Sequence, residues 1–294
     1  MSAINDFIEQ QLADWPEASS RYMDLGQTLR RRFKIGDFEG AFQYNPARMR
    51  STGAKIDKAS IAERPCFLCS ENRPSEQVAV PISQDWELLV NPFPIFPVHF
   101  TIASTRHIPQ DKVPLEIGAI ADRLPELAIF FNGARAGASA PDHLHLQAVL
   151  KNELPIIKLA EIHHQESALG VMRSDMFEAD LPFIFLSAVI SNDAEGAEDY
   201  MQLLAMTGAD PLTGNPDKGL RNVICWKGES GLLRMIVIPR RQHRPGCYGE
   251  NEDSLMVSPG TIDMSGVVIL PREADFNRIT EEDLKQIYKD VAIS

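Results

Sequence analysis

Two stretches of this chain share the same predicted order of secondary structure, and this recurrence is the strongest constraint on its fold. Residues 86–109 hold two apolar runs around a proline-rich turn, which predicts a β-hairpin with a widened loop. Residues 221–245 repeat the order of strand, turn, strand and basic exit. The first stretch ends in HIP at 107–109 and the second in HRP at 243–245. The recurrence indicates an internal duplication, although two similar hairpins can also arise without common descent.

The segments around the two hairpins predict a mixture of helices and strands. Apolar residues at helical spacing indicate that residues 1–60 are mainly helical. Short apolar or alternating runs predict further strands, and longer amphipathic segments predict helices. The chain is therefore expected to be α+β. The remaining predicted elements are helices at 112–124, 194–206 and 280–291, and strands at 127–131, 143–150 and 181–191.

Composition and charge narrow the class of function. Hydrophobic residues make up 44% of the chain and charged residues 24%, as in an ordinary globular protein. A net charge of -12 disfavours binding of a long nucleic acid, although a locally positive pocket can still bind a small anion. No apolar run reaches the roughly 18 residues of a membrane span. The segment MSAINDFIEQQLADW lacks the features of an export signal, so a cytoplasmic protein without membrane or nucleic-acid partners is expected.

His143, His145 and Gln147 alternate along a predicted strand, which places all three on one face. A solvated strand face is the simplest interpretation of an isolated H-x-H pattern. Two other features favour a functional site. The strand follows NGARAGASAPD, a small-residue loop that would let backbone N–H groups close around a phosphate. The chain also contains candidate metal ligands.

Cys66 and Cys69 form a C-x-x-C pair. In a reducing compartment such a pair indicates a metal or redox site before a disulfide. Structural zinc takes four nitrogen or sulfur ligands in tetrahedral geometry, so two histidines would complete the set. The long spacing excludes a zinc finger, and the site would tie distant segments together. Two reduced cysteines in a loop are the alternative.

These motifs resemble a known family when they are taken together and in order. CFLC at 66–69, the histidine that ends HFTIASTRH, and NG-x-x-AGAS followed by H-x-H-x-Q occur as in galactose-1-phosphate uridylyltransferase. That enzyme belongs to the transferase branch of the histidine-triad superfamily, with the diadenosine-tetraphosphate and GDP-hexose phosphorylases. The resemblance is clear over about residues 45–150 and looser over the second hairpin. It implies two histidine-triad-like halves, each an antiparallel sheet flanked by helices, which can merge into one sheet.

The resemblance also implies a division of the chain and a metal. The expected metal is a structural Zn²⁺ that holds the active-site loop. The implied segments are 1–60 as an N-terminal helical region and substrate loop, 61–215 as the catalytic half, and 216–294 as a second, non-catalytic half. The implied zinc ligands are Cys66, Cys69, His107 and His143.

Further roles follow from the resemblance residue by residue. His145 becomes the nucleophile, and Gln147 a donor to the phosphoryl oxygens. Asn132, Gly133 and Ser139 belong to the loop that contacts the phosphates. The stretch between Ser139 and His143 is one residue longer than in the uridylyltransferases, which puts the role of Ser139 in doubt.

Several polar residues have two open interpretations. Arg48 and Arg73 are expected to contact substrate, because cationic side chains neutralise phosphates, although a solvated loop is an equal alternative. The basic segment 240–244 either reaches the acceptor substrate or forms a surface turn. PVHF stands where the family has a glycine-histidine pair, which leaves His99 without a role.

The implied activity is that of a nucleotidyltransferase or phosphorylase. The substrate would be a nucleotide sugar or dinucleotide, the intermediate a covalent nucleotidyl-histidine, and the acceptor phosphate or a sugar phosphate. A glutamine in the third motif position resembles transferases, whereas most hydrolases of the superfamily have a third histidine. A histidine-triad hydrolase is therefore the second candidate, and a non-catalytic nucleotide-binding module the third. The base, the sugar and the dimerisation common in the superfamily are left open.

Overall fold

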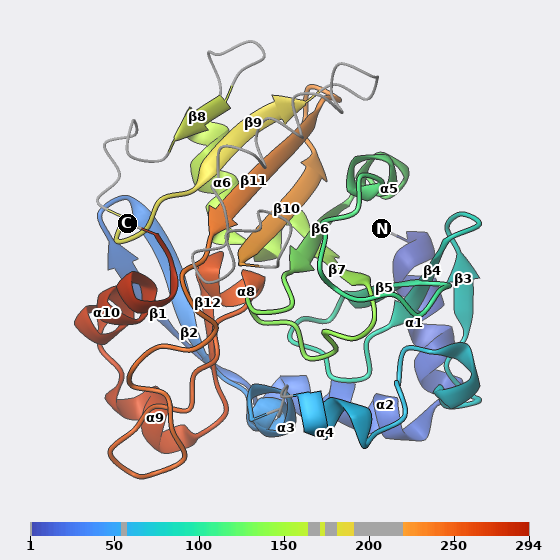
Figure 1. Ribbon diagram of the computed structural model, residues 1–294, viewed down its shortest axis with the longest axis horizontal. Coiled ribbons are helices and arrows are strands. Elements are labelled where there is room, and N and C mark those ends of the chain that lie inside the picture. Colours follow the sequence, from blue (N-terminus) through green and yellow to red (C-terminus); the bar gives the residue numbers. More distant parts are fainter. Residues whose placement is uncertain (1, 54–57, 164–170, 174–180, 191–219, 294) are drawn as a thin grey trace.

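A nine-stranded antiparallel sheet forms the centre of the computed structural model, which describes residues 2–53, 58–163, 171–173, 181–190 and 220–293. The spatial order is β3-β4-β5-β7-β6-β10-β11-β9-β8 (Figure 1). Strand β6 pairs with β10, so the strands of the first predicted half and those of the second form one continuous sheet. The strands are β3 (Ala79–Pro81), β4 (Trp86–Val90), β5 (His99–Ser104), β6 (Leu127–Asn132), β7 (His145–Leu150), β8 (Val171–Arg173), β9 (Leu186–Ile190), β10 (Arg221–Lys227) and β11 (Leu233–Pro239).

Both predicted hairpins are present, and the α+β fold class is confirmed. Strand β4 pairs with β5, and β10 pairs with β11, each in antiparallel register. The predicted strand over 143–150 begins two residues later, at His145. The predicted helix over 194–206 lies outside the described residues. The described helices are α1 (Ser2–Asp14), α2 (Pro16–Asp24), α3 (Met49–Thr52), α4 (Lys58–Ala62), α5 (Ile117–Arg123), α6 (Pro155–His163), α8 (Thr261–Met264), α9 (Glu273–Arg278) and α10 (Glu281–Val291).

The expectation that residues 1–60 are mainly helical is wrong for residues 29–44. Strands β1 (Leu29–Ile35) and β2 (Phe38–Tyr44) form a tight hairpin there. The sequence signal is weak because only Phe33 and Ile35 of β1 are buried, and the preceding arginines are exposed. A third strand, β12 (Val267–Leu270), pairs with β2 in parallel. N-terminal and C-terminal segments thus share a small sheet, and the predicted domain limits remain a prediction.

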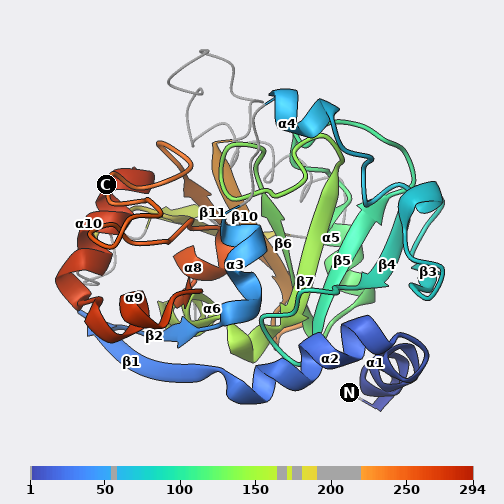
Figure 2. The same cartoon turned by 90° about the horizontal axis from the view of Figure 1, so that it is seen from below.

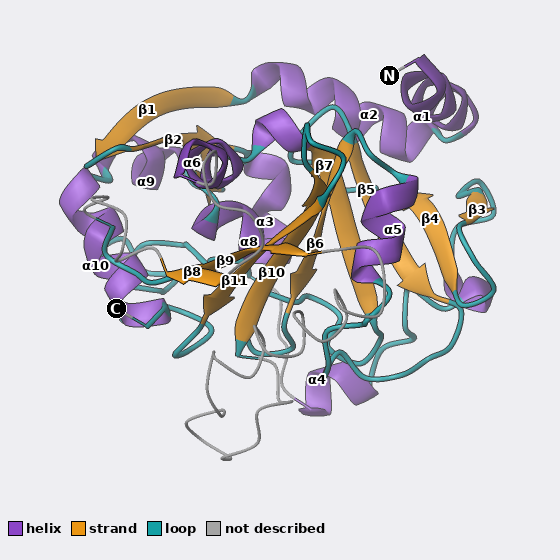
Figure 3. Cartoon of the chain, turned by 90° about the horizontal axis from the view of Figure 1, so that it is seen from above, coloured by secondary structure: helices purple, strands orange, loops and turns teal. Residues whose placement is uncertain are grey.

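Alternation along the central strands separates two apolar cores. On one face Phe130 and Ile224 pack with the small sheet and helices α6, α8, α9 and α10. On the other face Phe131 and Val223 pack with α1 and α5. Figure 3 shows the β1–β2 hairpin and α6 on one side of the large sheet, and Figure 2 shows α1 beside β4, opposite α9 and α10. The described residues contain no helix long and apolar enough to cross a membrane.

Candidate active site and metal centre

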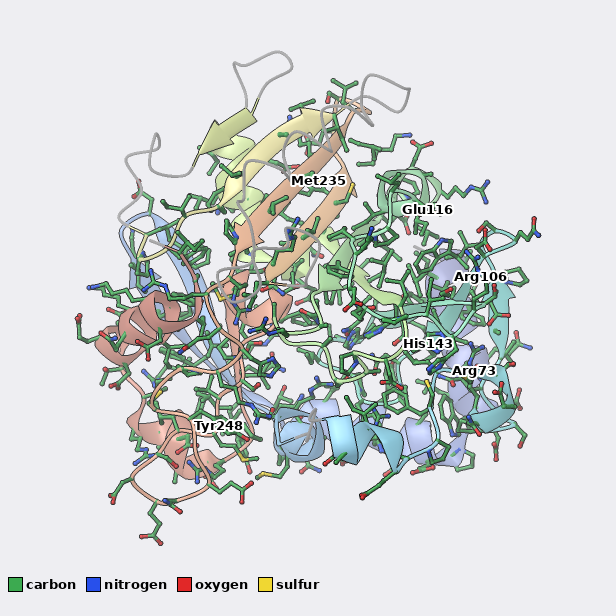
Figure 4. All side chains as sticks on the ribbon, viewed as in Figure 1. Arg73, Arg106, Glu116, His143, Met235 and Tyr248 are labelled. Carbon is green, nitrogen blue, oxygen red and sulfur yellow. The ribbon has the colours of Figure 1, made fainter. Side chains whose placement is uncertain are left out.

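The four predicted zinc ligands lie together beside β5 and β7. The ligand atoms of Cys66, Cys69, His107 and His143 are all within 4.8 Å of one another. Cys66 Sγ is 3.3 Å from His143 Nδ1, and Cys69 Sγ is 3.2 Å from His107 Nδ1. Figure 4 shows His143 on the side of the molecule that carries β4 and β5, far from Tyr248. The structure therefore brings segments near 66, 107 and 143 to one point.

The geometry of this cluster suits a tetrahedral metal ion. Zinc–sulfur and zinc–nitrogen bonds of about 2.3 and 2.1 Å place tetrahedral ligand atoms about 3.5 Å apart. The sulfur–nitrogen distances of 3.2 to 3.5 Å are close to that separation. His143 Nε2–H donates to Ser104 O at 2.8 Å, so the lone pair is on Nδ1, the atom that faces the sulfurs. The cluster can hold a metal without a change of tautomer.

Electrostatics give a second test of the fit. Burial and the neighbouring Cys66 thiol raise the pKa of Cys69 to about 11. Two thiols this close resist deprotonation on their own, whereas a bound cation stabilises both thiolates. The donor set therefore matches a soft divalent metal such as Zn²⁺.

Arg73 stabilises the loop that contains Cys66 and Cys69. Its Nε and one terminal nitrogen donate to Leu68 O at 2.9 and 2.7 Å. The other terminal nitrogen donates to Glu87 Oε2 on β4 at 2.7 Å, and the Arg73 side chain is only 6% exposed. These contacts occupy the guanidinium, and its predicted contact with substrate stays a prediction.

His145 has the tautomer that a nucleophile needs. Its Nδ1–H donates to His143 O at 2.8 Å, which leaves the lone pair on Nε2. Burial lowers the pKa of His145 to about 4, against the opposite effect of that hydrogen bond. The imidazole is therefore neutral near pH 7, as attack on phosphorus requires.

His99, which had no role from the sequence, orients Gln147. His99 Nδ1 accepts a hydrogen bond from Ile95 N at 3.1 Å, so its proton is on Nε2. That Nε2–H donates to Gln147 Oε1 at 2.9 Å. Burial, and then the charge of Arg48, lower the pKa of His99 to about 3. Gln147 Nε2 has no partner among the described residues, so its N–H groups can donate to a ligand.

The contact between His99 and Gln147 follows from the pairing of β5 with β7. His99 and Thr101 alternate along β5, and the register pairs them with Val149 and Gln147 of β7. Residues paired across an antiparallel ladder share a face. The position of His99 on the neighbouring strand follows from that register, which single-sequence reasoning did not supply.

The small-residue loop 133–139 packs closely against the segment before α8. Gly137 has a φ of +102°, and a Cβ there would lie 2.5 Å from Gly260 Cα. Only glycine fits this position, because a side chain would both strain the backbone and collide. Gly137 N donates to His243 Nδ1 at 3.3 Å, and Gly133 N donates to Arg221 O at 3.1 Å. The second hairpin unit thus shapes the loop.

Asn132 and Ser139, at the two ends of this loop, differ in their contacts. Asn132 Oδ1 accepts from Thr261 N and Thr261 Oγ1, both at 2.8 Å, and from Asn222 Nδ2 at 3.1 Å. It therefore joins β6, β10 and α8. The Ser139 carbonyl accepts from Arg64 at 3.3 Å, while its N–H and hydroxyl have no partner among the described residues. Ser139 keeps two donors for a ligand.

The charges of two arginines, the half-buried Arg48 and the buried Arg240, interact with that of Asp263. Arg48 donates to Phe93 O at 2.7 Å, and burial lowers its pKa to about 10. Arg240 is 1% exposed and donates to Asn222 Oδ1 at 2.6 Å and Pro259 O at 3.0 Å. Arg240 is thus a buried clamp rather than part of a surface turn. Burial raises the pKa of Asp263 to about 6, although two backbone amides and Arg48 oppose this shift.

The fold of the chain is similar to that of solved structures. Three crystal structures of yeast Ap4A phosphorylase align with the chain. The complex with AMP gives a TM-score of 0.63 at 14% identity and covers 96% of this chain and 95% of that chain. The complex with Ap4A gives 0.60 at 13% identity, covering 94% and 96%. The chain has the fold of an Ap4A phosphorylase.

The remaining comparisons add less. An ADP-glucose phosphorylase from Arabidopsis thaliana aligns at a TM-score of only 0.37, with 14% identity, 90% of this chain covered and 100% of that chain. Residues 7–150 match a family described as "Domain of unknown function (DUF4922)". No curated protein matches the chain in sequence. The likeness to yeast Ap4A phosphorylase confirms the fold that the sequence resemblance implied.

Proposed function

We propose that this protein is a nucleotide phosphorylase that acts through a nucleotidyl-enzyme on His145. The observation that carries the proposal is the state of this side chain. His145 is buried and neutral, its Nδ1–H is held by His143 O, and its Nε2 keeps the lone pair. Gln147 Nε2 and the N–H and hydroxyl of Ser139 have no partner among the described residues and can donate to a ligand.

The proposed reaction has two displacement steps at one phosphorus atom. His145 Nε2 attacks the nucleotide phosphorus, and the bond from that phosphorus to the oxygen of the leaving group breaks, which is a nucleoside polyphosphate for a dinucleotide and a sugar phosphate for a nucleotide sugar. In the second step an oxygen of inorganic phosphate or a sugar phosphate attacks, and the phosphorus–nitrogen bond breaks to restore the neutral imidazole. Gln147 and Ser139 would donate to the equatorial oxygens, where charge builds up in the transition state.

We propose that the cluster of two cysteines and two histidines holds a structural zinc ion. The metal would fix the segment 66–69 against residues 107 and 143. Because His143 O also accepts the Nδ1–H of His145, a fixed His143 keeps the nucleophile in its tautomer. The metal's contribution is therefore the position of the backbone beside His145.

A small-molecule nucleotide is the expected substrate class. Yeast Ap4A phosphorylase, whose fold this chain shares, has been crystallised with AMP and with Ap4A. The motif glutamine favours phosphate or a sugar phosphate as acceptor over water. An Ap4A-like dinucleotide and a nucleotide sugar are both candidate donors.

Intact-protein mass spectrometry tests the proposal. The purified protein would be incubated briefly with Ap4A, ADP-glucose, a UDP-sugar or a GDP-sugar. A gain of one nucleoside monophosphate is expected, stable to base, labile to acid and absent from His145→Ala. His243→Gln, which changes a histidine outside the cluster, should still form the adduct.

The acceptor separates the candidate reactions. Turnover that inorganic phosphate or a sugar phosphate accelerates supports transfer, whereas turnover independent of both supports the hydrolase. Bound AMP without any adduct or turnover would reject catalysis and leave a binding module.

A further inference from the structure

Strands β6 and β7 separate at the point where the nucleophile lies. Their ladder runs from Leu127 opposite Leu150 to Phe130 opposite Gln147. Two residues further, the same register would place Asn132 opposite His145, but the ladder has ended there. A side chain from another segment fills the gap, namely the fully buried Gln110.

The Gln110 carboxamide makes three hydrogen bonds to the backbone of the two strands. Its Nε2 donates to Asn132 O at 2.9 Å and to His145 O at 2.8 Å. Its Oε1 accepts from His145 N at 2.7 Å. A carboxamide flipped by 180° would direct its oxygen at two carbonyl oxygens and its NH₂ at an N–H group. The network therefore fixes the orientation and uses both amide hydrogens.

We propose that Gln110 is a positioning residue that holds the backbone of His145 at a set distance from the loop 133–139. Asn132 is the last residue of β6 before this loop, and His145 is the first residue of β7. By bridging both, Gln110 replaces direct strand pairing with a wider, side-chain-filled gap. The distance between the nucleophile and the loop amides then depends on one carboxamide.

The segment that carries Gln110 also carries a candidate metal ligand. His107 faces Cys69, and three residues later Gln110 enters the sheet. Ile108 O accepts from Leu144 N at 2.6 Å, and Gln110 N donates to Pro141 O at 3.0 Å. The short stretch 107–110 thus joins the cluster of cysteines and histidines to the segment 141–145, which ends at the proposed nucleophile.

A matched pair of variants tests the role of Gln110. Gln110→Leu keeps the shape of the side chain but removes all three hydrogen bonds. Gln11→Leu is the control, because Gln11 is also buried and bonds two backbone groups, Glu76 O and Val78 N, away from the site. Metal content and thermal unfolding would be measured on both.

The readouts separate positioning from general stability. For Gln110→Leu, adduct formation from Ap4A should slow about 100-fold, because a small displacement of a reacting group has an effect of this size. Affinity for AMP should change by less than about threefold, since uniform binding is retained. Exchange of the His145 amide hydrogen should accelerate about tenfold or more, and Gln11→Leu should leave all three quantities unchanged.

The proposal would be overturned by an adduct rate near that of the wild type, by an unchanged His145 amide, or by a parallel loss of AMP affinity and metal. Of these measurements, only the rate of adduct formation rests on the proposed function. If the wild type forms no adduct, the function fails, and the exchange of the His145 amide alone decides the role of Gln110. If Gln110→Leu does not fold, hydrogen exchange at the Gln110 side-chain amide of the wild type tests the proposal instead. These two hydrogens should exchange slowly. Exchange as fast as that of an exposed glutamine would reject the proposal.

Discussion

The two hairpins of the central sheet end in the same short pattern, but their histidines have different surroundings. After β5, His107 is exposed and faces the sulfur of Cys69. After β11, His243 is half-buried, accepts from Gly137 N, and lies 3.2 Å from Ser258 Oγ. Burial, together with the charges of Arg240 and Arg244, lowers the pKa of His243 to about 3.

The difference shows that the partner opposite the histidine decides its role. The thiols near His107 suit this histidine to bind a metal, whereas an amide and a hydroxyl next to His243 suit that histidine to hold the loop 133–139 in its neutral form. The first hairpin unit would supply the nucleophile and the metal, and the second would hold the loop around the substrate. Four predictions test this division, from the largest effect to the smallest.

The nucleophile should be confined to the first unit. His145→Ala is expected to lower the rate of adduct formation by at least about 1000-fold, because no other described histidine has the same placement. His243→Gln should lower it by less than about tenfold. Single-turnover kinetics with Ap4A would measure both. Equal losses in the two variants would break the proposed division.

Metal binding should depend on the first unit alone. Cys66→Ser is expected to remove the metal and lower the unfolding temperature by about 10 °C, because metal binding is coupled to folding. Cys247→Ser, an exposed cysteine in the second unit, is the control and should leave both unchanged. Elemental analysis and thermal unfolding provide the measurements. A variant at Cys66 with full metal content would reject the assignment.

The close packing of the loop 133–139 against Gly260 should require glycine at position 137. Gly137→Ala places a methyl group against Gly260 in a strained backbone, and the free energy of unfolding should fall by about 2 kcal/mol. Gly231→Ala is the control, because its φ is also positive, at +84°, but the space around it is open. Backbone strain alone should lower its stability by about 1 kcal/mol. Denaturant titration would reveal the difference, and identical losses would mean that the contact with Gly260 is unimportant.

A low pH should reduce the stability that neutral His243 contributes through its contacts with Gly137 and Ser258. Its pKa is about 3 in the folded protein and near 6.5 when unfolded, so the unfolded state takes up the proton first as the pH falls. The stability from the neutral histidine is complete above pH 6.5 and is lost as the pH falls towards 3. His243→Gln should therefore lose about 2 kcal/mol less than the wild type between pH 7 and pH 5. Parallel stability curves for the two proteins would contradict the buried state of His243.

The sequence allowed prediction of what depends on local pattern. Apolar runs around a turn predicted both hairpins. The family resemblance carried by CFLC, His107 and H-x-H-x-Q implied that four ligand atoms converge. The β1–β2 hairpin was missed because the elements that pack against it, among them β12 and α10, are distant in the chain. The contacts of His99 and Gln110 were missed for a related reason. Both depend on the register between strands, which one sequence does not reveal.

The parallel pairing of β2 with β12 has a consequence for the order of folding. Ala41 pairs with Val267, so this sheet closes only after the whole chain between them has been synthesised. Pairing over such a long separation has a high entropic barrier and is slow. Until then the apolar face of the β1–β2 hairpin lacks its third strand, and a nascent chain that exposes it is prone to aggregation. Chaperone dependence during synthesis would follow from this one strand pairing.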